Sequence, residues 1–269
     1  MFKLEFKEKI KLFRTLHDQN NPLMLPNAWD ASSAKIFERN DFQAIGTTSA
    51  GIAATLGYPD GEKIPLELML NSISNISKNT KLPVSADIEG GYAANIFDLR
   101  KILNELEKFE VVGINIEDGR GTYLREINEQ KVILDFIKAY SPHLFINARI
   151  DSFWLDIGDL KDRIKDVIVR AEEYKKSGAD CIFIPGVKDI ETIKVLRENI
   201  ELPINLLQSE NLNSMQNIKT LKIERVSLGS SAFRNILTNL DKISSTFKQG
   251  KLLHSNGNLT YQDLNLLMD

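Results

Sequence analysis

The chain has 269 residues, of which 42% are hydrophobic and 26% charged, proportions that are typical of a globular protein. Its 34 Lys and Arg and 37 Asp and Glu residues give a formal net charge of −3, which argues against the broad basic surface that nucleic-acid binding requires. One cysteine, Cys181, allows neither an intrachain disulfide nor a cysteine-based zinc site. We see no signal-peptide core and no membrane-spanning apolar run, so we expect a cytoplasmic protein without a membrane partner.

Helical and strand patterns alternate along the whole chain. An amphipathic helix is predicted over residues 5–19, where Leu12, Phe13 and Leu16 share one stripe. Residues 42–51 are predicted to be a strand that runs into a loop, and 57–61 a turn. Strands are predicted to begin near residues 23, 44, 83, 112, 144, 181, 203 and 225. Helices are predicted over 32–40, 65–79, 95–108, 128–139, 160–176, 189–199 and 211–219, with more helix after the last strand.

Apolar strands that alternate with helices indicate parallel β/α units. Eight such units in about 250 residues predict a (β/α)8 TIM barrel. We expect one domain over residues 1–269, with an N-terminal helix and a C-terminal helical tail at about 232–269. The alternative is a doubly wound open sheet, but its nucleotide-binding versions carry a Gly-x-Gly-x-x-Gly or a phosphate-binding loop that we do not find.

Two consecutive predicted strands end in acidic residues that are followed by glycine. Asp87 and Glu89 follow the first of these strands, and Glu117 and Asp118 follow the second. Carboxylates held close together repel each other unless a cation or a shared proton lies between them. We therefore predict a Mg2+ site, because hard cations prefer oxygen ligands. The alternative is that these acids cap helices or pair with lysines on the surface.

The carboxyl ends of all barrel strands open on one mouth, so other polar strand-end residues are expected beside the acids. They are Asn27, Asp30, Thr48, Ser49, Asn147, Arg149, Asp151, Gln208 and Ser230. A mouth with several acids and one arginine suits a small anionic ligand that is held through a metal. Spacing alone leaves open whether Arg149 binds the ligand or forms a structural salt bridge with Asp151.

Several short motifs resemble those of the isocitrate lyase/phosphoenolpyruvate mutase superfamily, in its phosphonomutase-like branch. In chain order they are Pro26-Asn27-Ala28-Trp29-Asp30, Thr47-Thr48-Ser49-Ala50-Gly51, Leu56-Gly57-Tyr58-Pro59-Asp60, Ala86-Asp87-Ile88-Glu89-Gly90-Gly91-Tyr92, Ile116-Glu117-Asp118 and Asn147-Ala148-Arg149-Ile150-Asp151. Each motif is weak by itself, whereas the ordered set is specific and covers roughly residues 20–235.

The resemblance implies a barrel whose eighth helix is exchanged between the subunits of a homodimer or homotetramer. It implies Mg2+, or Mn2+ in its place, bound by Asp87 with Glu89 and Glu117 as companions, largely through water. The implied catalytic residues are Asp60, on a gating loop, Glu117 and Arg149, which binds a carboxylate or enolate oxygen. The implied substrate-binding residues are Asn27, Ser49, Ala50, Gly51 and Arg149.

The implied substrate is a small α-keto acid or an enolpyruvyl or phosphonate compound. A C–C or P–C bond is then cleaved or rearranged through an enolate-like species that cations stabilise. The loop after Glu117 lacks the Cys and His of the superfamily's lyases, which disfavours an isocitrate or methylisocitrate lyase reaction. Two other functions remain open: a catalytically reduced barrel that binds a keto acid as a scaffold or regulatory subunit, and an aldolase with a Schiff-base lysine.

Overall fold

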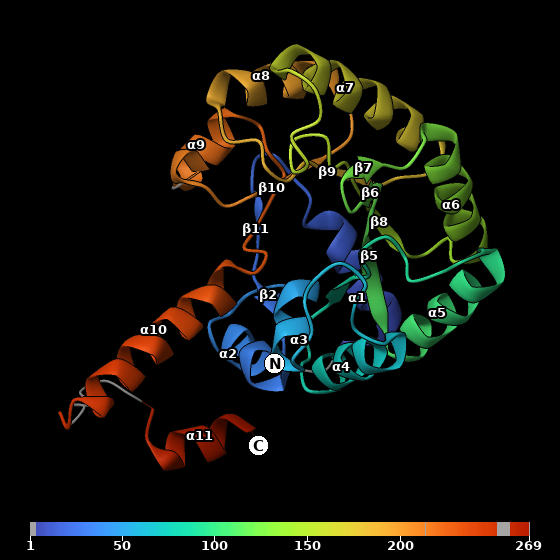
Figure 1. Ribbon diagram of the computed structural model, residues 1–269. Coiled ribbons are helices and arrows are strands. Elements are labelled where there is room, and N and C mark those ends of the chain that lie inside the picture. The colour runs from blue at the N-terminus through green and yellow to red at the C-terminus, as the bar shows by residue number, and fades with distance from the viewer. Residues whose placement is uncertain (1–3, 213, 252–258, 269) are drawn as a thin grey trace.

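Short parallel strands pair side by side until the sheet meets itself (Figure 1). The computed structural model describes residues 4–212, 214–251 and 259–268. Its parallel strands are β1 (Leu23–Leu25), β2 (Asn27–Ala28), β3 (Ile45–Thr47), β4 (Val84–Asp87), β5 (Val111–Glu117), β8 (Phe145–Arg149), β9 (Cys181–Phe183), β10 (Ile204–Leu207) and β11 (Arg225–Ser227). The strand starts agree with the predicted ones within two residues, and the predicted (β/α)8 barrel is confirmed.

The barrel closes at its first strand. Pro26 has no N–H to give to the ladder and divides this strand into β1 and β2. β1 pairs with β11 on one side, and β2 pairs with β3 on the other. The carbonyl of Pro26 still accepts a hydrogen bond from the Gly46 N–H at 2.8 Å, so the break costs the sheet little.

A ring of helices covers the outer face of the sheet (Figure 1). It consists of α2 (Ala31–Arg39), α4 (Leu66–Lys78), α5 (Ile96–Lys108), α6 (Ile127–Tyr140), α7 (Leu160–Lys176), α8 (Ile190–Asn199) and α9 (Met215–Thr220). Outward-facing strand residues such as Ile114, Ile146 and Ile182 are fully buried beneath these helices. Asn95 and Asp159 each cap the first turn of the helix that follows, an interaction typically worth about 1 kcal/mol.

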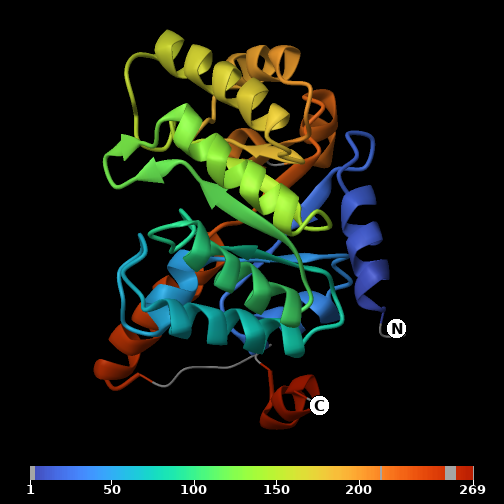
Figure 2. The same cartoon turned by 90° about the vertical axis from the view of Figure 1, so that its right-hand side faces the viewer.

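Helix α1 (Phe6–Thr15) closes the amino end of the barrel. Phe13 is fully buried and packs in a cluster that includes Leu25, Phe145 and Cys181. The short hairpin formed by β6 (Gly119–Arg120) and β7 (Tyr123–Leu124) lies at the opposite end (Figure 2). Among the described residues, the cavity for a ligand therefore opens at the carboxyl end.

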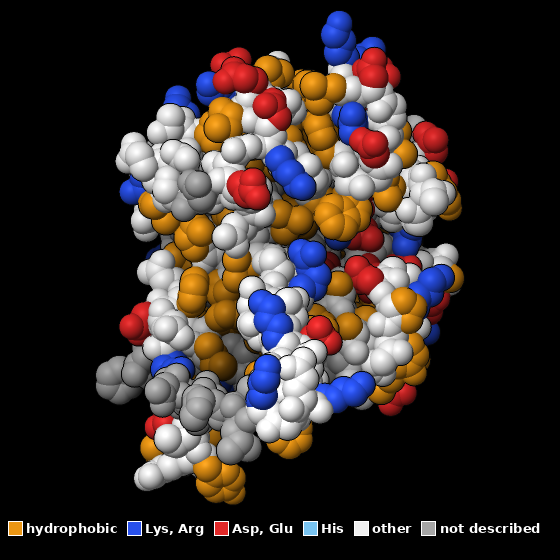
Figure 3. Space-filling model, turned by 60° about the vertical axis from the view of Figure 1, so that its left-hand side comes forward, with side chains coloured by type: hydrophobic (Ala, Val, Ile, Leu, Met, Phe, Trp, Pro, Cys, Tyr) orange, Lys and Arg blue, Asp and Glu red, His pale blue; other side chains and the backbone are white. Residues whose placement is uncertain are grey.

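Helix α10 (Ser231–Lys248), the eighth in the α/β order, leaves the barrel after its first turn instead of packing along it, and α11 (Tyr261–Met268) follows (Figure 1). Both lie in the tail predicted at about 232–269, of which residues 252–258 and 269 lie outside the described part. Figure 3 brings this side of the molecule forward and shows hydrophobic side chains gathered on it. Those of α10 that are exposed are Ile236, Leu237, Leu240, Ile243 and Phe247.

Several elements differ from the sequence prediction. The helix predicted over residues 5–19 ends at Thr15, and the one predicted over 211–219 begins as α9 at Met215, after a 3-10 turn at Glu210–Leu212. Residues 49–55, expected to begin as a loop, form α3 (Ser49–Thr55), whose small residues carry no amphipathic pattern and whose N-cap is Thr48. The β6–β7 hairpin was not predicted, and it turns at Gly121, which has a φ of 63°. No helix in the part of the chain that the structure describes is long and apolar enough to cross a membrane.

Candidate active site

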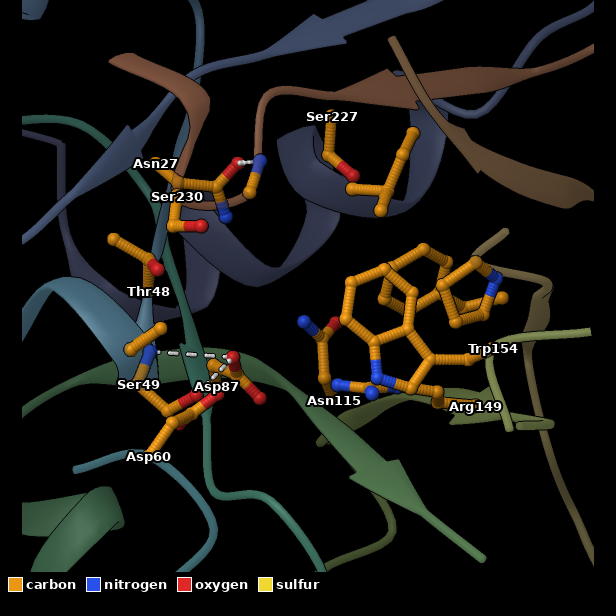
Figure 4. Close-up of a pocket in the computed structure, with 15 residues that line it drawn as sticks. Asn27, Thr48, Ser49, Asp60, Asp87, Asn115, Arg149, Trp154, Ser227 and Ser230 are labelled. Carbon is orange, nitrogen blue, oxygen red and sulfur yellow. Dashed lines mark hydrogen bonds between the residues drawn. The ribbon is translucent and has the colours of Figure 1, made fainter. Parts of the chain in front are cut away.

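Two adjoining cavities open at the carboxyl ends of the strands, and Figure 4 shows the first of them, which Asp87 and Asn115 help to line. They share Ser49, Asp60, Arg149 and Trp154. The acidic residues that line one or both are Asp60, Asp87, Glu89, Glu117 and Asp151. The apolar residues of the facing wall are Trp154, Phe183, Pro185 and Leu207. The structure therefore brings most of the predicted site residues to one mouth.

Asp87 lies at the end of β4 on its inner face and is buried. Its Oδ2 accepts hydrogen bonds from the Ser49 backbone N–H at 3.3 Å and from the Ser49 hydroxyl at 3.0 Å. Because Ser49 begins α3, the first turn of this helix fixes the carboxylate in place. Oδ1 has only a long contact of 3.4 Å with the Glu89 N–H, so it is the freer oxygen.

Arg149 stands at the end of β8 between two carboxylates. Its Nη1 is 2.6 Å from Glu117 Oε2, and its Nε is 2.6 Å from Asp151 Oδ1. Burial by itself would lower the pKa of Arg149, but Glu117 and Asp151 more than offset it, so the pKa is raised. The guanidinium also lies 5.8 Å from the ring centroid of Trp154. Arg149 thus forms the salt bridge with Asp151 and still lines both cavities.

The mouth carries more acid than its one arginine balances. Burial raises the pKa of Glu117 well above its usual range, against the influence of Arg149. Desolvation also raises the pKa of Asp60 on the rim, and nearby Asp87 raises it further. Asp87 adds to the raised pKa of Glu117 as well. Such a surplus of partly desolvated carboxylates favours a bound cation.

Glu89 is turned toward the loop that carries Asp60. Its backbone has a φ of 51°, so it no longer follows the alternation of strand β4. Its carboxylate accepts the Tyr92 hydroxyl and, at 2.5 Å, the Glu62 N–H. Burial raises the pKa of Glu89 to about 7, with Tyr92 acting in the opposite direction and Asp87 in the same one.

The predicted metal ligands surround the mouth but do not converge on one point. Across residues 4–212, 214–251 and 259–268, no group of three His, Cys, Asp or Glu side chains is close enough to hold a metal ion directly. Glu89 faces Tyr92, and Glu117 faces Arg149. The donor set and the excess negative charge fit a hydrated divalent cation beside Asp87, whereas direct ligation by all three carboxylates is not set up.

Three residues predicted for substrate binding have different surroundings. Asn27 lines the mouth, but its Oδ1 accepts the N–H groups of Leu228 and Gly229 at 3.0 and 2.9 Å, and its Nδ2 donates to the Thr47 carbonyl at 2.8 Å. Asn27 thereby connects β2, in the first strand of the barrel, to the loop that follows β11, the last strand. One hydrogen of its amide stays available for a ligand. Ala50 lines the cavity. Gly51 lies in α3 and lines neither cavity; an added Cβ there would be 2.7 Å from Thr48 Cγ2.

The prediction that Asp118 belongs to the acidic mouth is wrong. Asp118 is fully buried on the other side of the strand and accepts the Tyr174 hydroxyl at 2.7 Å and Arg170 Nη1 at 3.2 Å. Its Oδ1 accepts the Asp151 N–H at 2.9 Å, so it positions Asp151 from behind. Asp30, also predicted at the mouth, caps α2 through the Ser33 N–H.

Asn115 and Trp154 are among the mouth residues that the sequence analysis missed. Asn115 precedes Glu117 by two residues on β5, and the period of a strand would have placed both on the inner face. Trp154 lies in the loop after β8, and no local pattern points to it.

Comparisons with known proteins agree with this fold. The profile of the family described as Phosphoenolpyruvate phosphomutase matches residues 13–248. An uncharacterised protein of Mycobacterium tuberculosis is 34% identical over 219 residues, which are 81% of each chain. An oxaloacetate decarboxylase of Pseudomonas fluorescens is 29% identical over 269 residues, covering 94% of this chain and 89% of that one. A crystal structure from Burkholderia cenocepacia J2315, of a protein proposed to be a phosphonomutase, has a TM-score of 0.84 at 28% identity and covers 88% of this chain and 99% of that one.

Proposed function

The chain belongs to the phosphoenolpyruvate phosphomutase family, within the isocitrate lyase/phosphoenolpyruvate mutase superfamily of enzymes, and on that premise we propose that it cleaves the C–C bond one carbon removed from the keto group of a small α-keto acid. The observation that carries the proposal is the position of Arg149 beside Asp60 and Asp87 at one mouth. When this bond breaks, its electron pair stays on the carbon next to the keto group and forms an enolate, whose charge a preorganised cation stabilises.

Different residues of the mouth are proposed to bind the substrate and the metal. The guanidinium of Arg149 offers the substrate a fixed positive charge with several N–H donors. We propose that Asp87 holds Mg2+, or Mn2+, and that Glu89 and Glu117 act on it through water. When bound, the metal would supply Lewis-acid stabilisation of the enolate oxygen. Asp60 lies on the loop over the mouth and is proposed to help close the site around the substrate.

A carboxylate substrate fits the mouth better than a phosphonate. Among the described residues that line the two cavities, Arg149 is the one Lys or Arg. A phosphonate group carries up to two charges and calls for more cationic partners, as phosphate sites in general do. The wall formed by Trp154, Phe183 and Leu207 instead suits an apolar substituent on the keto acid. Decarboxylation or retro-aldol cleavage is therefore favoured over P–C chemistry.

The lining residues also bear on the two other functions. No lysine lines either cavity in the described part of the chain, which removes the group that a Schiff-base aldolase needs. No cysteine or histidine lines them there either, and this observation favours the second candidate, a barrel that binds a keto acid without turnover.

One experiment separates the two candidates. The protein is incubated with Mg2+ and a panel of keto acids that includes oxaloacetate, with pyruvate formation followed by a coupled assay and binding followed by calorimetry. Product formation that EDTA abolishes and Mg2+ restores supports the proposed enzyme. Binding without turnover of any panel member supports the binding barrel, and the absence of both binding and turnover contradicts the two together.

We also propose that α10 is exchanged between subunits in a homodimer or homotetramer. Its first turn still packs on the barrel, where buried Phe233 contacts Trp29, and beyond it the helix exposes five large apolar side chains, of which Leu240 is 53% and Phe247 67% exposed. A single helix with such a face needs a partner to bury it. A second copy of the chain, from which the eighth helix is likewise displaced, offers a matching surface.

A further inference from the structure

A layer of polar side chains fills the barrel directly beneath the mouth. Its members are Ser85, Asn115, Asn147, Asn205 and Arg225, all of them buried. Arg225 is fully buried, and its Nη2 contacts Asn115 Oδ1 at 3.3 Å. Among the described residues, its Nε and Nη1 have no hydrogen-bond partner. Burial lowers the pKa of Arg225 to about 10, so it stays charged at neutral pH.

A buried guanidinium without a carboxylate partner destabilises a fold, so packing alone does not account for Arg225. Its electrostatic influence reaches the mouth, because Asp87 is one of the two groups that raise its pKa against the effect of burial. The side chain that connects it to the mouth is Asn115, which lines the upper cavity.

Arg225 decides which way the amide of Asn115 points. A guanidinium has no acceptor, so the Asn115 atom that faces it has to be the oxygen. The same oxygen accepts Asn147 Nδ2 at 2.8 Å. The amide nitrogen of Asn115 is thereby directed elsewhere, and Figure 4 shows it turned toward the side of the cavity where Asp87 lies. Asp87 and Asn115 are paired neighbours on β4 and β5.

We propose that Asn115 Nδ2 donates a hydrogen bond to a carboxylate or enolate oxygen of a keto acid bound between Asp87 and Arg149, and that Arg225 is the residue that positions it. The charge of Arg225 on the Asn115 oxygen polarises the amide and strengthens its N–H donors. The Asn115 amide is already oriented before a ligand binds, because Arg225 and Asn147 both donate to its oxygen. The inference rests on the proposed function, because it requires a small anion in this mouth.

The test uses oxalate, a planar dianion that mimics an enolate, with the full-length protein in Mg2+. Calorimetry is run on wild type, Asn115→Leu, Arg225→Met and the double variant. Loss of a hydrogen bond to a charged ligand predicts about tenfold to a hundredfold weaker oxalate binding for Asn115→Leu. Arg225→Met is expected to weaken binding by a smaller factor. The double variant should bind like Asn115→Leu, because Arg225 acts through Asn115.

Ser85→Ala is the matched control, since Ser85 belongs to the same layer and its hydroxyl has no partner among the described residues. It should bind oxalate like wild type. Mg2+ affinity measured without oxalate should stay unchanged in Asn115→Leu, which separates a ligand contact from damage to the metal site. If Arg225→Met does not fold, Arg225→Lys and Asn115→Ser replace it, and Asn115→Ser should still weaken oxalate binding.

The outcomes distinguish the inference from the proposed function. Wild type that binds neither oxalate nor any keto acid contradicts the proposed function. Wild type that binds oxalate while Asn115→Leu binds it equally well contradicts only the role of Asn115. Additive losses in the double variant contradict the positioning role of Arg225, and the polar layer then serves only to hold buried water.

Discussion

Arg149 and Glu117 form an ion pair of 2.6 Å across the ends of two paired strands, where they are register partners in β8 and β5. Asp151 holds the same guanidinium from its other side. The arginine is therefore fixed before any ligand arrives, and the mouth does not have to reorganise to present it.

Arg149→Lys should weaken keto-acid binding by about tenfold or more, because lysine keeps the charge but not the rigid fork of donors. Oxalate affinity measured by calorimetry in the presence of Mg2+ checks this. Arg163→Lys is a suitable control, since Arg163 lines neither cavity, lies over the Phe153 ring and pairs with the exposed Asp156. Equal oxalate affinity in wild type and Arg149→Lys would remove Arg149 from the proposed binding site.

Asp87→Asn should weaken Mn2+ binding by about tenfold or more, because a neutral amide replaces the carboxylate closest to the proposed metal. Titration followed by electron paramagnetic resonance reports free Mn2+ directly. Asp118→Asn is the contrasting variant, since Asp118 pairs with buried Arg170 and Tyr174 away from the mouth. It should lower the free energy of unfolding by about 3 kcal/mol and leave Mn2+ affinity nearly unchanged. Identical metal affinities in wild type and Asp87→Asn would overturn the proposed metal site.

The four acidic residues at the ends of β4 and β5 show which side-chain positions can be predicted from the sequence and which cannot. Glu117 is the last residue of β5 and Asp118 follows it, so their side chains leave opposite faces, and the strand period alone could have separated them. Asp87 and Glu89 share the spacing of one strand face, but β4 ends at Asp87 and Glu89 adopts a positive φ. The turn therefore redirects Glu89 toward Tyr92, which no periodic pattern could indicate.

The order of elements, by comparison, follows from local signals. Alternating apolar strands and amphipathic helices predict the barrel, and the barrel predicts that strand-end residues such as Asp87 and Arg149 share a mouth. The path of α10 does not follow from such signals, because its apolar stripe is equally compatible with packing on its own barrel or on another copy. The position of Trp154 depends on a loop whose shape is set by tertiary contacts.

Glu62 holds the loop that carries Asp60 against the barrel. Its carboxylate accepts Arg120 Nη1 at 2.8 Å and the Tyr92 N–H at 2.8 Å, and its own N–H donates to Glu89. Glu62→Gln removes the charge from this set of contacts. The free-energy difference between the closed and the open loop should change by about 1 kcal/mol in favour of the open loop, which raises its equilibrium population roughly fivefold. Hydrogen exchange of residues 57–63 should become faster, and kcat/KM should fall with little change in Tm. Lys63→Gln, at the exposed neighbouring position, is the control. Unchanged exchange in Glu62→Gln would show that the loop is held by other contacts.

The exposed face of α10 predicts a measurable effect on assembly. Leu240→Glu places a charge in the apolar stripe and should shift the protein toward smaller species, as measured by size-exclusion chromatography with light scattering. Lys242→Glu, on the exposed surface of the same helix, changes the charge outside that stripe and should leave the molar mass unchanged. A wild-type protein that is monomeric at high concentration would contradict the exchange of α10.

The stability of the barrel should depend on pH through His17, which follows α1 and stacks on Phe145 with ring centroids 4.2 Å apart. Its Nδ1 donates to the Phe13 carbonyl at 2.9 Å, and its buried Nε2 has no partner among the described residues. Protonation would put a second N–H into this apolar contact. Burial, with the nearby charge of Arg225, therefore lowers the pKa of His17 from 6.5 to about 3.

The sign of the pH effect follows from that lowered pKa. Between about pH 6.5 and 3 the unfolded chain binds a proton at His17 that the folded chain does not, so the free energy of unfolding falls as the pH falls through this window. The loss approaches about 1.4 kcal/mol per pH unit below 6.5. His17→Phe keeps the stacking on Phe145 but cannot be protonated. Urea unfolding at pH 7.5, 6.5 and 5.5 should show wild type losing about 1.4 kcal/mol more than His17→Phe between the first and last pH. If the free energy of unfolding falls equally in the two proteins, His17 is not the group responsible for the loss of stability at low pH.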